Sequence, residues 1–127
     1  MAAEELPTSI PGGTYVTEAQ GKELFDKGTL FMDARVAAAY ADEHVKGAIN
    51  VVYKETRPKG SRTAPTDTFN LAKLPADKAK PMVFYCNGSP CWKGHKAAAA
   101  AIKAGYKHVY SMREGMPGRK VKGYPAE

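Results

Sequence analysis

The sequence contains two cysteines whose spacing suggests chemistry rather than a structural cross-link. Cys86 and Cys91 have only four residues between them, whereas structural disulfides of small secreted domains usually come in larger sets and close longer loops. An apolar, β-prone run ends just before Cys86, and a helical pattern begins at Cys91. A thiol in such a strand-to-helix loop is well placed to act as a nucleophile.

The loop itself is suited to hold an anion. Its backbone N–H groups are expected to point inward and the helix start adds positive partial charge, so both favour a thiolate at Cys86. Gly88 permits the backbone conformation required, whereas Pro90 lacks an N–H and removes one donor. We predict that Cys86 is the catalytic nucleophile. Its substrate-binding cradle would consist of Asn87, Gly88, Ser89, Pro90, Cys91, Trp92 and Lys93.

A thiolate in an anion cradle could transfer sulfur, cleave phosphate esters or exchange disulfides. Cysteine phosphatases end this loop with an arginine, whose planar fork clamps phosphate oxygens. Cys91 stands at that position here and Lys93 offers only a point charge, so phosphatase chemistry is disfavoured. No metal site is predicted, because zinc needs further ligands and His95 is the only other candidate nearby. On its apolar helix face, His95 is better explained as a packed side chain.

Alternating strand and helix patterns must position this loop. Strands are predicted at 14–16, 30–33, 48–52, 82–85 and 108–112. Helices are predicted from Thr17 to near Gly28 and at 36–41, 70–74 and 91–104. Basic residues, prolines and a glycine without hydrophobic periodicity predict a long surface loop at 54–68.

This alternation is typical of an α/β domain whose parallel sheet is covered by helices on both faces. In such folds ligands collect at the carboxyl ends of the strands, where Cys86 is expected. The chain has 127 residues, of which 43% are hydrophobic, enough for one core. We therefore predict an N-terminal extension at 1–13 and a single domain at 14–127.

Three stretches resemble signature motifs of the rhodanese (sulfurtransferase) family. Residues 30–35 match its strand-Asp-x-Arg motif, and residues 44–50 match its His-x-x-Gly-Ala-x-Asn motif. The third stretch is the strand, six-residue loop and alanine-rich helix around Cys86, followed by 105–110. The similarity runs from about Thr17 to Pro125 and is greatest to single-domain members with a Cys-Asn-Gly-x-x-Cys-Trp loop.

The resemblance implies a three-layer α/β/α rhodanese-like domain with a mainly parallel central sheet of about five strands. It also implies a sulfurtransferase that needs no cofactor. Cys86 would take sulfane sulfur from thiosulfate or polysulfide as a persulfide and pass it to a thiol or cyanide acceptor, or to an acceptor protein. Asp33, Arg35 and His44 would give structural support.

The sequence departs from the family pattern at two places, and these departures limit which family properties can be expected of this chain. Cys91 replaces the usual arginine or similar residue at the loop end, which alters donor recognition. Glu114 and Arg119 stand where the final motif commonly has glycine and tryptophan, which alters packing of the carboxy-terminal helix.

Charge and hydropathy limit the partners. The net charge of +6 favours anions, but the basic residues are scattered and no nucleic-acid motif is present, so small anions are expected rather than nucleic acid. No apolar run approaches the roughly 20 residues of a membrane span, so no membrane association is expected. Related single-domain members are often exported, which predicts a periplasmic location. Because residues 1–13 contain no signal peptide, a cytoplasmic location is the alternative.

The residues leave two other functions open. Cys91 is either a small packing residue or a resolving thiol that closes a disulfide with Cys86, which would make a thiol-disulfide or redox-sensing protein. The missing loop arginine and the 54–68 loop would also suit a non-enzymatic sulfur carrier.

Overall fold

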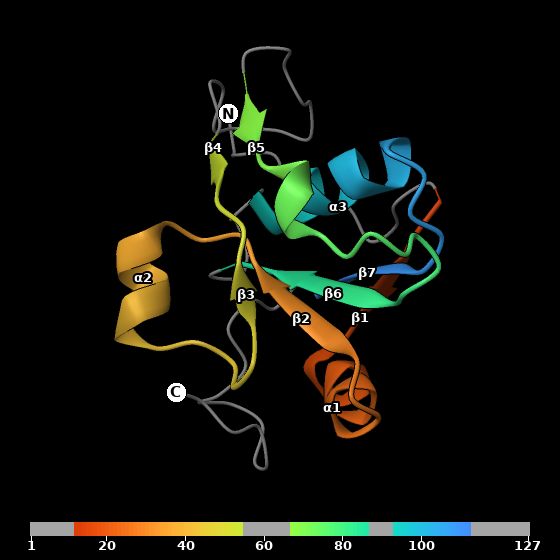
Figure 1. The fold of residues 1–127 in the computed structure, drawn as a ribbon. Coiled ribbons are helices and arrows are strands. Elements are labelled where there is room, and N and C mark those ends of the chain that lie inside the picture. The colour runs from red at the N-terminus through yellow and green to blue at the C-terminus, as the bar shows by residue number, and fades with distance from the viewer. Residues whose placement is uncertain (1–11, 55–66, 87–92, 113–127) are drawn as a thin grey trace, which may run out of the picture.

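The computed structural model describes residues 12–54, 67–86 and 93–112, and its central strands form from the apolar runs that begin at Leu30 and Met82 (Figure 1). Its strands are β1 (Thr14–Val16), β2 (Leu30–Asp33), β3 (Ile49–Asn50), β4 (Tyr53–Lys54), β5 (Thr68–Phe69), β6 (Met82–Tyr85) and β7 (Val109–Met112). Its helices are α1 (Glu18–Asp26), α2 (Ala37–Asp42), the 3-10 helix η1 (Leu71–Lys73) and α3 (Lys93–Lys103).

Five of the strands make a parallel sheet in the order β1-β7-β6-β2-β3. β6 lies in the middle, with Phe84 paired to Met32 on one side and to Ser111 on the other. The predicted mainly parallel sheet of about five strands is therefore confirmed. Since all five strands run the same way, their carboxyl ends meet at one edge, where Cys86 follows β6.

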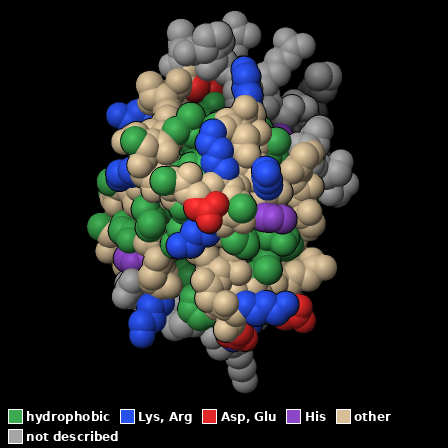
Figure 2. All heavy atoms as spheres, turned by 45° about the vertical axis from the view of Figure 1, so that its right-hand side comes forward, with side chains coloured by type: hydrophobic (Ala, Val, Ile, Leu, Met, Phe, Trp, Pro, Cys, Tyr) green, Lys and Arg blue, Asp and Glu red, His purple; other side chains and the backbone are tan. Residues whose placement is uncertain are grey.

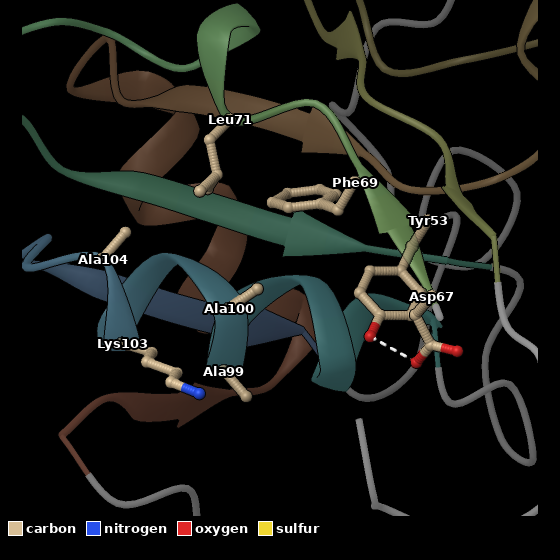
Figure 3. Close-up of a pocket in the computed structure, with 8 residues that line it drawn as sticks. All are labelled: Tyr53, Asp67, Phe69, Leu71, Ala99, Ala100, Lys103 and Ala104. Carbon is tan, nitrogen blue, oxygen red and sulfur yellow. Dashed lines mark hydrogen bonds between the residues drawn. The ribbon is translucent and has the colours of Figure 1, made fainter. Parts of the chain in front are cut away.

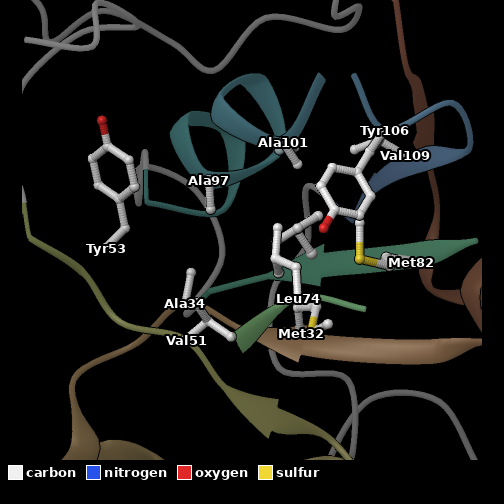
Figure 4. Packing of buried hydrophobic residues seen from close by; sticks show 12 residues of the cluster. Met32, Ala34, Val51, Tyr53, Leu74, Met82, Ala97, Ala101, Tyr106 and Val109 are labelled. Carbon is white, nitrogen blue, oxygen red and sulfur yellow. The ribbon is translucent and has the colours of Figure 1, made fainter. Parts of the chain in front are cut away.

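Helices cover both faces of this sheet, which confirms the three-layer arrangement (Figure 1). On one face, α3 packs over Met32 and Met82, together with Leu74, which follows η1 (Figure 4). On the other face, α1 and α2 lie over Phe31 and Val83. Successive residues of a strand point to opposite faces, so a strand buried on both faces is apolar throughout, as β6 is.

The start of helix α1 is set by a capping box formed by Thr17 and Gln20. The Thr17 hydroxyl accepts a hydrogen bond from the Gln20 backbone N–H at 3.1 Å, and the Gln20 side chain accepts one from the Thr17 N–H at 2.8 Å. This reciprocal capping box satisfies two backbone donors that the first helical turn leaves without partners. The predicted helix start at Thr17 is confirmed.

The region after β3 differs from the prediction. The predicted strand at 48–52 is only Ile49–Asn50, and the chain then enters a separate antiparallel pair, in which Tyr53 is paired with Phe69 and Lys54 with Thr68. Both ends of the predicted 54–68 loop are therefore strand. The two rings of the first pair lie 5.6 Å apart, and this aromatic contact between strands distant in sequence holds the ends together.

Some predicted segments lie outside the described residues: most of the extension, residues 55–66, the loop at 87–92 and residues 113–127. The proposed domain boundary after residue 13 stays a prediction. In the part of the chain that the structure describes, no helix is both long and apolar enough to cross a membrane.

Candidate active site

Cys86 follows directly after β6, the central strand of the sheet, and its side chain is 4% exposed. The next strand, β2, ends in register with β6, because Asp33 is paired with Tyr85 and also with Asn50 of β3. The expected position of Cys86 at the carboxyl edge of the sheet is therefore observed.

The sulfur of Cys86 is part of a disulfide in the structure. The sequence has one other cysteine, Cys91, which lies outside the described residues. A disulfide sulfur is not a nucleophile, so any thiolate chemistry at Cys86 requires prior reduction.

Helix α3 approaches Cys86 closely through a glycine. A Cβ atom on Gly94 would lie 3.3 Å from the Tyr85 carbonyl carbon and 3.4 Å from the Cys86 nitrogen. These atoms belong to the backbone, so they cannot rotate away. The absence of a side chain at Gly94 thus lets the first turn of α3 rest on the backbone that carries Cys86. Sequence analysis did not identify this residue, because a glycine inside a helical pattern carries no signal of what it touches.

A buried ion pair stands beside Cys86 on the neighbouring strand. The Arg35 Nη2 atom lies 2.7 Å from Asp33 Oδ2, and Arg35 Nε donates to the same carboxylate at 3.0 Å. Arg35 Nη2 also donates to the Glu43 carbonyl. Burial alone lowers the pKa of Arg35, but the hydrogen bonds and charge of Asp33 outweigh it, so the pKa is raised and the guanidinium stays charged. The pair ties the end of β2 to the segment after α2.

His44 lies within that segment. Its Nδ1 atom is 2.7 Å from the Tyr40 carbonyl oxygen, and its ring stacks on the Tyr40 ring at 3.7 Å. The Tyr40 hydroxyl donates to the Ala48 carbonyl at 2.6 Å. These contacts fix the backbone between α2 and β3, and they leave His44 engaged within its own loop.

Tyr85 joins this network from β6. Its hydroxyl accepts a hydrogen bond from the Val45 N–H at 3.1 Å, and the Arg35 guanidinium lies 5.7 Å from its ring centre. Burial first, and then the charge of Asp33, raise the pKa of the Tyr85 phenol far above its usual value, so it stays protonated. Asn50 adds a side-chain amide that donates to the Asp33 and Arg35 carbonyls at 3.1 and 2.9 Å.

Tyr85 and Asn50 were assigned no role from the sequence. The Tyr85 hydroxyl is hydrogen-bonded to the backbone N–H of Val45, which is 40 residues away in the sequence, so a local sequence pattern cannot show this contact. Asn50 stands in the motif that resembles the rhodanese family, and that position is the signal that could have marked it.

His95 is buried where α3 meets β1. Its Nδ1 atom lies 2.5 Å from the Tyr15 hydroxyl, and the two rings stack with centres 6.0 Å apart. Burial, and then the charge of Lys96, lower the pKa of His95, so it is neutral near pH 7. This matches the expectation of a packed histidine.

The predicted cradle can be placed only in part. Lys93 begins α3, but its side chain and the whole of 87–92 lie outside the described residues. Within the described ranges, no three His, Cys, Asp or Glu side chains come together as metal ligands.

A model of the rhodanese-like domain matches residues 17–120, which is most of the chain. The chain belongs to the rhodanese-like family. This assignment agrees with the motifs around Asp33 and His44, whose side chains hydrogen-bond to Arg35 and to the Tyr40 carbonyl in the structure.

Individual relatives of this rhodanese-like chain are distant. A tRNA uridine(34) hydroxylase from Hamiltonella defensa subsp. Acyrthosiphon pisum (strain 5AT) is 32% identical over 111 residues, covering 82% of this chain and 27% of that protein. The chain thus spans less than a third of the hydroxylases it matches.

Solved structures support the fold. The Alr3790 protein from Anabaena sp. has a TM-score of 0.62 at 19% identity, covering 88% of this chain and 90% of that one. A protein of unknown function from Rhodopseudomonas palustris CGA009, called a possible tyrosine phosphatase, has a TM-score of 0.61 at 19% identity and covers 96% of this chain and 99% of its own. At these identities the similarity establishes a shared rhodanese-like fold and no particular chemistry.

Proposed function

We propose that this rhodanese-like domain is a sulfurtransferase that carries sulfane sulfur as a persulfide on Cys86. The observation that carries the proposal is the place of Cys86, buried directly after the central strand at the edge where ligands bind in parallel α/β sheets. Family membership supports the same assignment.

The reaction starts from the reduced protein, so a thiol reductant must first open the disulfide at Cys86. The Cys86 thiolate then attacks the outer sulfur of thiosulfate. A new S–S bond forms, the old S–S bond breaks, and sulfite leaves with its electron pair. In the second step a cyanide or thiolate acceptor attacks the outer persulfide sulfur, forms thiocyanate or a new persulfide, and regenerates the Cys86 thiolate.

The loop after Cys86 supplies the groups that would stabilise these anions. Backbone amides within 87–92 and the start of α3 would face the persulfide, and Lys93 would attract the anionic donor as a point charge. Gly94 supports this geometry, because it brings the first turn of α3 within van der Waals distance of the Cys86 backbone. Asp33, Arg35 and His44 would act by holding the neighbouring segments in place.

We also propose small sulfur-containing anions, rather than nucleic acid, as the substrates. The tRNA hydroxylases named above are several times longer than this chain, so their substrate need not be shared. A periplasmic location is consistent with a disulfide at Cys86, because disulfides persist in oxidising compartments. An acceptor protein remains an alternative to a small thiol.

Mass spectrometry tests the proposal directly. The protein is reduced, freed of reductant, and incubated with thiosulfate or polysulfide. We expect one added sulfur atom on wild type and on Cys91→Ser, and none on Cys86→Ser. Addition of cyanide should remove the sulfur and release thiocyanate. Equal sulfur loading of wild type and Cys86→Ser would refute the assignment.

A second candidate function is thiol-disulfide exchange or redox sensing, and the disulfide at Cys86 favours it. In this case the disulfide is the functional product, and Cys91 is the resolving thiol. Equilibration in glutathione buffers of stepped potential, followed by alkylation, should give a reversible transition in wild type that Cys91→Ser lacks. An unchanged transition in Cys91→Ser would exclude a role for Cys91.

A non-enzymatic sulfur carrier is the third candidate. It would load one sulfur per chain but release it to small acceptors only slowly. Rapid multiple turnover with thiosulfate and cyanide, without a protein partner, would exclude it.

A further inference from the structure

Helix α3 is packed incompletely on one of its sides. A pocket of about 450 Å³ lies there, between the helix and the chain segment that contains β4, β5 and η1. Figure 3 shows Ala100 and Ala104 pointing from α3 toward the side chains of Phe69 and Leu71. Alanine methyl groups are too short to fill this space, so dispersion contacts are missing along the pocket. Packing on this side therefore does not by itself fix the position of α3.

His95 lies on another side of α3, away from the pocket. Each helical residue turns by about 100°, so His95 and Ala100, five residues apart, project about 140° from one another. The Nδ1 atom of His95 and the Tyr15 hydroxyl form a hydrogen bond of 2.5 Å, and the two rings stack with centres 6.0 Å apart. Tyr15 belongs to β1, which is paired with β7 in the sheet. The hydrogen bond therefore ties the first turn of α3 to the sheet.

The carboxyl end of α3 is held by a different group. Lys78 Nζ donates a hydrogen bond of 2.6 Å to the Ala104 carbonyl oxygen. Lys103, in the last turn, forms neither an ion pair nor a hydrogen bond with any described residue, and Figure 3 shows its side chain on the side of α3 away from Phe69. Figure 2 shows other basic side chains among apolar ones on one face of the molecule, with few acidic ones. Lys78 thus holds the carboxyl end, and His95 the amino end.

The first turn of α3 also approaches the backbone of the proposed nucleophile. A Cβ atom on Gly94 would lie 3.4 Å from the Cys86 nitrogen. Gly94 precedes His95 directly, so it follows any movement of His95. The start of a helix carries positive partial charge, which stabilises an anion only within about one turn. The position of this turn therefore decides how strongly α3 stabilises a thiolate at Cys86.

We propose that Tyr15 and His95 are positioning residues for the reaction at Cys86. Their hydrogen bond holds the first turn of α3 against the Cys86 backbone, and so sets the electrostatic stabilisation of the thiolate and the persulfide. Both residues act through the position of α3, not by contact with the transferred sulfur. The inference rests on the proposed function, because it takes the Cys86 thiolate as the reactive form.

The test measures how fast iodoacetamide alkylates Cys86 between pH 7 and pH 10. The parent is the reduced full chain with Cys91→Ser, in which Cys86 is the one remaining cysteine. Burial, and then the charge of Lys96, lower the pKa of His95, so its own titration does not enter this range. The plateau rate at high pH reports access to the sulfur. The rate near pH 7 divided by the plateau rate reports the thiolate fraction.

Tyr15→Phe keeps the ring and removes the hydroxyl. We expect this ratio to fall about threefold with the plateau rate unchanged, because the helix start then stabilises the thiolate less well. His95→Leu should have the same effect. The double variant should lose no more than either single variant, because all three lack the same hydrogen bond. His95→Asn places an amide group near the position of Nδ1 and should restore most of the parent ratio.

Two control variants separate positioning from a loss of stability. Lys78→Met removes the hydrogen bond at the carboxyl end of α3. Tyr110→Phe removes a half-buried tyrosine hydroxyl of β7 that forms no hydrogen bond with a described residue. Both variants should keep the parent ratio, although Lys78→Met also loosens α3. Circular dichroism checks that each variant is folded.

Three results would overturn the proposal: an unchanged ratio in Tyr15→Phe, an equal decrease in either control, or single-variant effects that multiply in the double variant. If Tyr15→Phe does not fold, the comparison of His95→Leu with His95→Asn decides in its place. Alkylation requires no sulfur donor. Failure of the sulfur-loading experiment would therefore overturn the proposed function, whereas failure of the alkylation test would overturn the positioning role alone.

Discussion

The two sides of Cys86 are built by different means. On the β2 side, a polar flank of Asp33, Arg35, His44 and Tyr85 holds the chain through buried hydrogen bonds and an ion pair. On the α3 side, an apolar flank of Gly94, Ala97, Ala98 and Ala101 relies on close approach of small side chains.

This difference determines what each flank tolerates. A buried polar network is sensitive to loss of one partner, because the remaining group keeps its desolvation cost. A flank of small residues is sensitive to added volume, because a close-packed interior has no space for it. Deletions should therefore damage the polar flank, and enlargements the apolar flank.

The largest effect is expected from Arg35→Met. It leaves the fully buried Asp33 carboxylate without its cation, which should lower the free energy of unfolding by about 3–5 kcal/mol. This change in the free energy of unfolding is measured by urea denaturation monitored by circular dichroism. The double variant Asp33→Leu/Arg35→Met removes both charges and should be more stable than Arg35→Met. If the double variant is the less stable of the two, desolvation of the remaining charge is not the cause.

An intermediate effect is expected from Gly94→Val. The new side chain would meet the backbone of Tyr85 and Cys86, so the free energy of unfolding should fall by about 1–3 kcal/mol. The matched control is Lys103→Val at an exposed position of the same helix, where only helix propensity is lost, about 0.5 kcal/mol. Similar losses in both variants would show that the close approach at Gly94 is unimportant for stability.

The smallest effect concerns pH and the border of the apolar flank. The pKa of His95 is lowered in the fold by burial and by Lys96, so the unfolded chain binds a proton that the folded chain does not. The contribution of His95 to the free energy of unfolding should thus be fully present above the ordinary histidine pKa of about 6.5. It should fall as the pH drops below that value, by at most about 1.4 kcal/mol per pH unit.

This pH effect is measured by urea denaturation between pH 5 and 8, with the pH range set by that ordinary pKa of about 6.5. His95→Gln should remove the histidine contribution to the slope, whereas His108→Gln, at an exposed position, should keep it. A slope that survives unchanged in His95→Gln would assign the effect to other groups.

Much of the fold could be predicted from local patterns. Local sequence alone predicted β2 and β6 from the β-prone runs at Leu30 and Met82, and the start of α1 from the capping sequence at Thr17. All three elements form where they were expected. The resemblance to the rhodanese family predicted a mainly parallel sheet of about five strands, but the strand order β1-β7-β6-β2-β3 was not predicted and comes from the structure. The position of Cys86 at a strand end was likewise predictable, because both the strand and the helix after it are marked in the sequence.

What could not be predicted depends on contacts between distant residues. Tyr85 looks like any apolar strand residue until the fold brings Val45 to its hydroxyl. The β4 and β5 pair is short, and the rings of Tyr53 and Phe69 meet only after the chain has turned back. Gly94 has a role because of one backbone approach, which no local pattern records.

The strand order also has a consequence for how the chain folds. β1 is an edge strand whose only partner in the described sheet is β7, the last strand. Thr14 therefore cannot pair with Tyr110 until nearly all of the described chain is available. β2 and β3, by contrast, are separated by a short α-helical connection. Pairing of such distant segments is slow, because loop closure must precede the contacts that stabilise it. We expect β1, with its Tyr15–His95 contact, to join the sheet late, after most of the chain has left the ribosome.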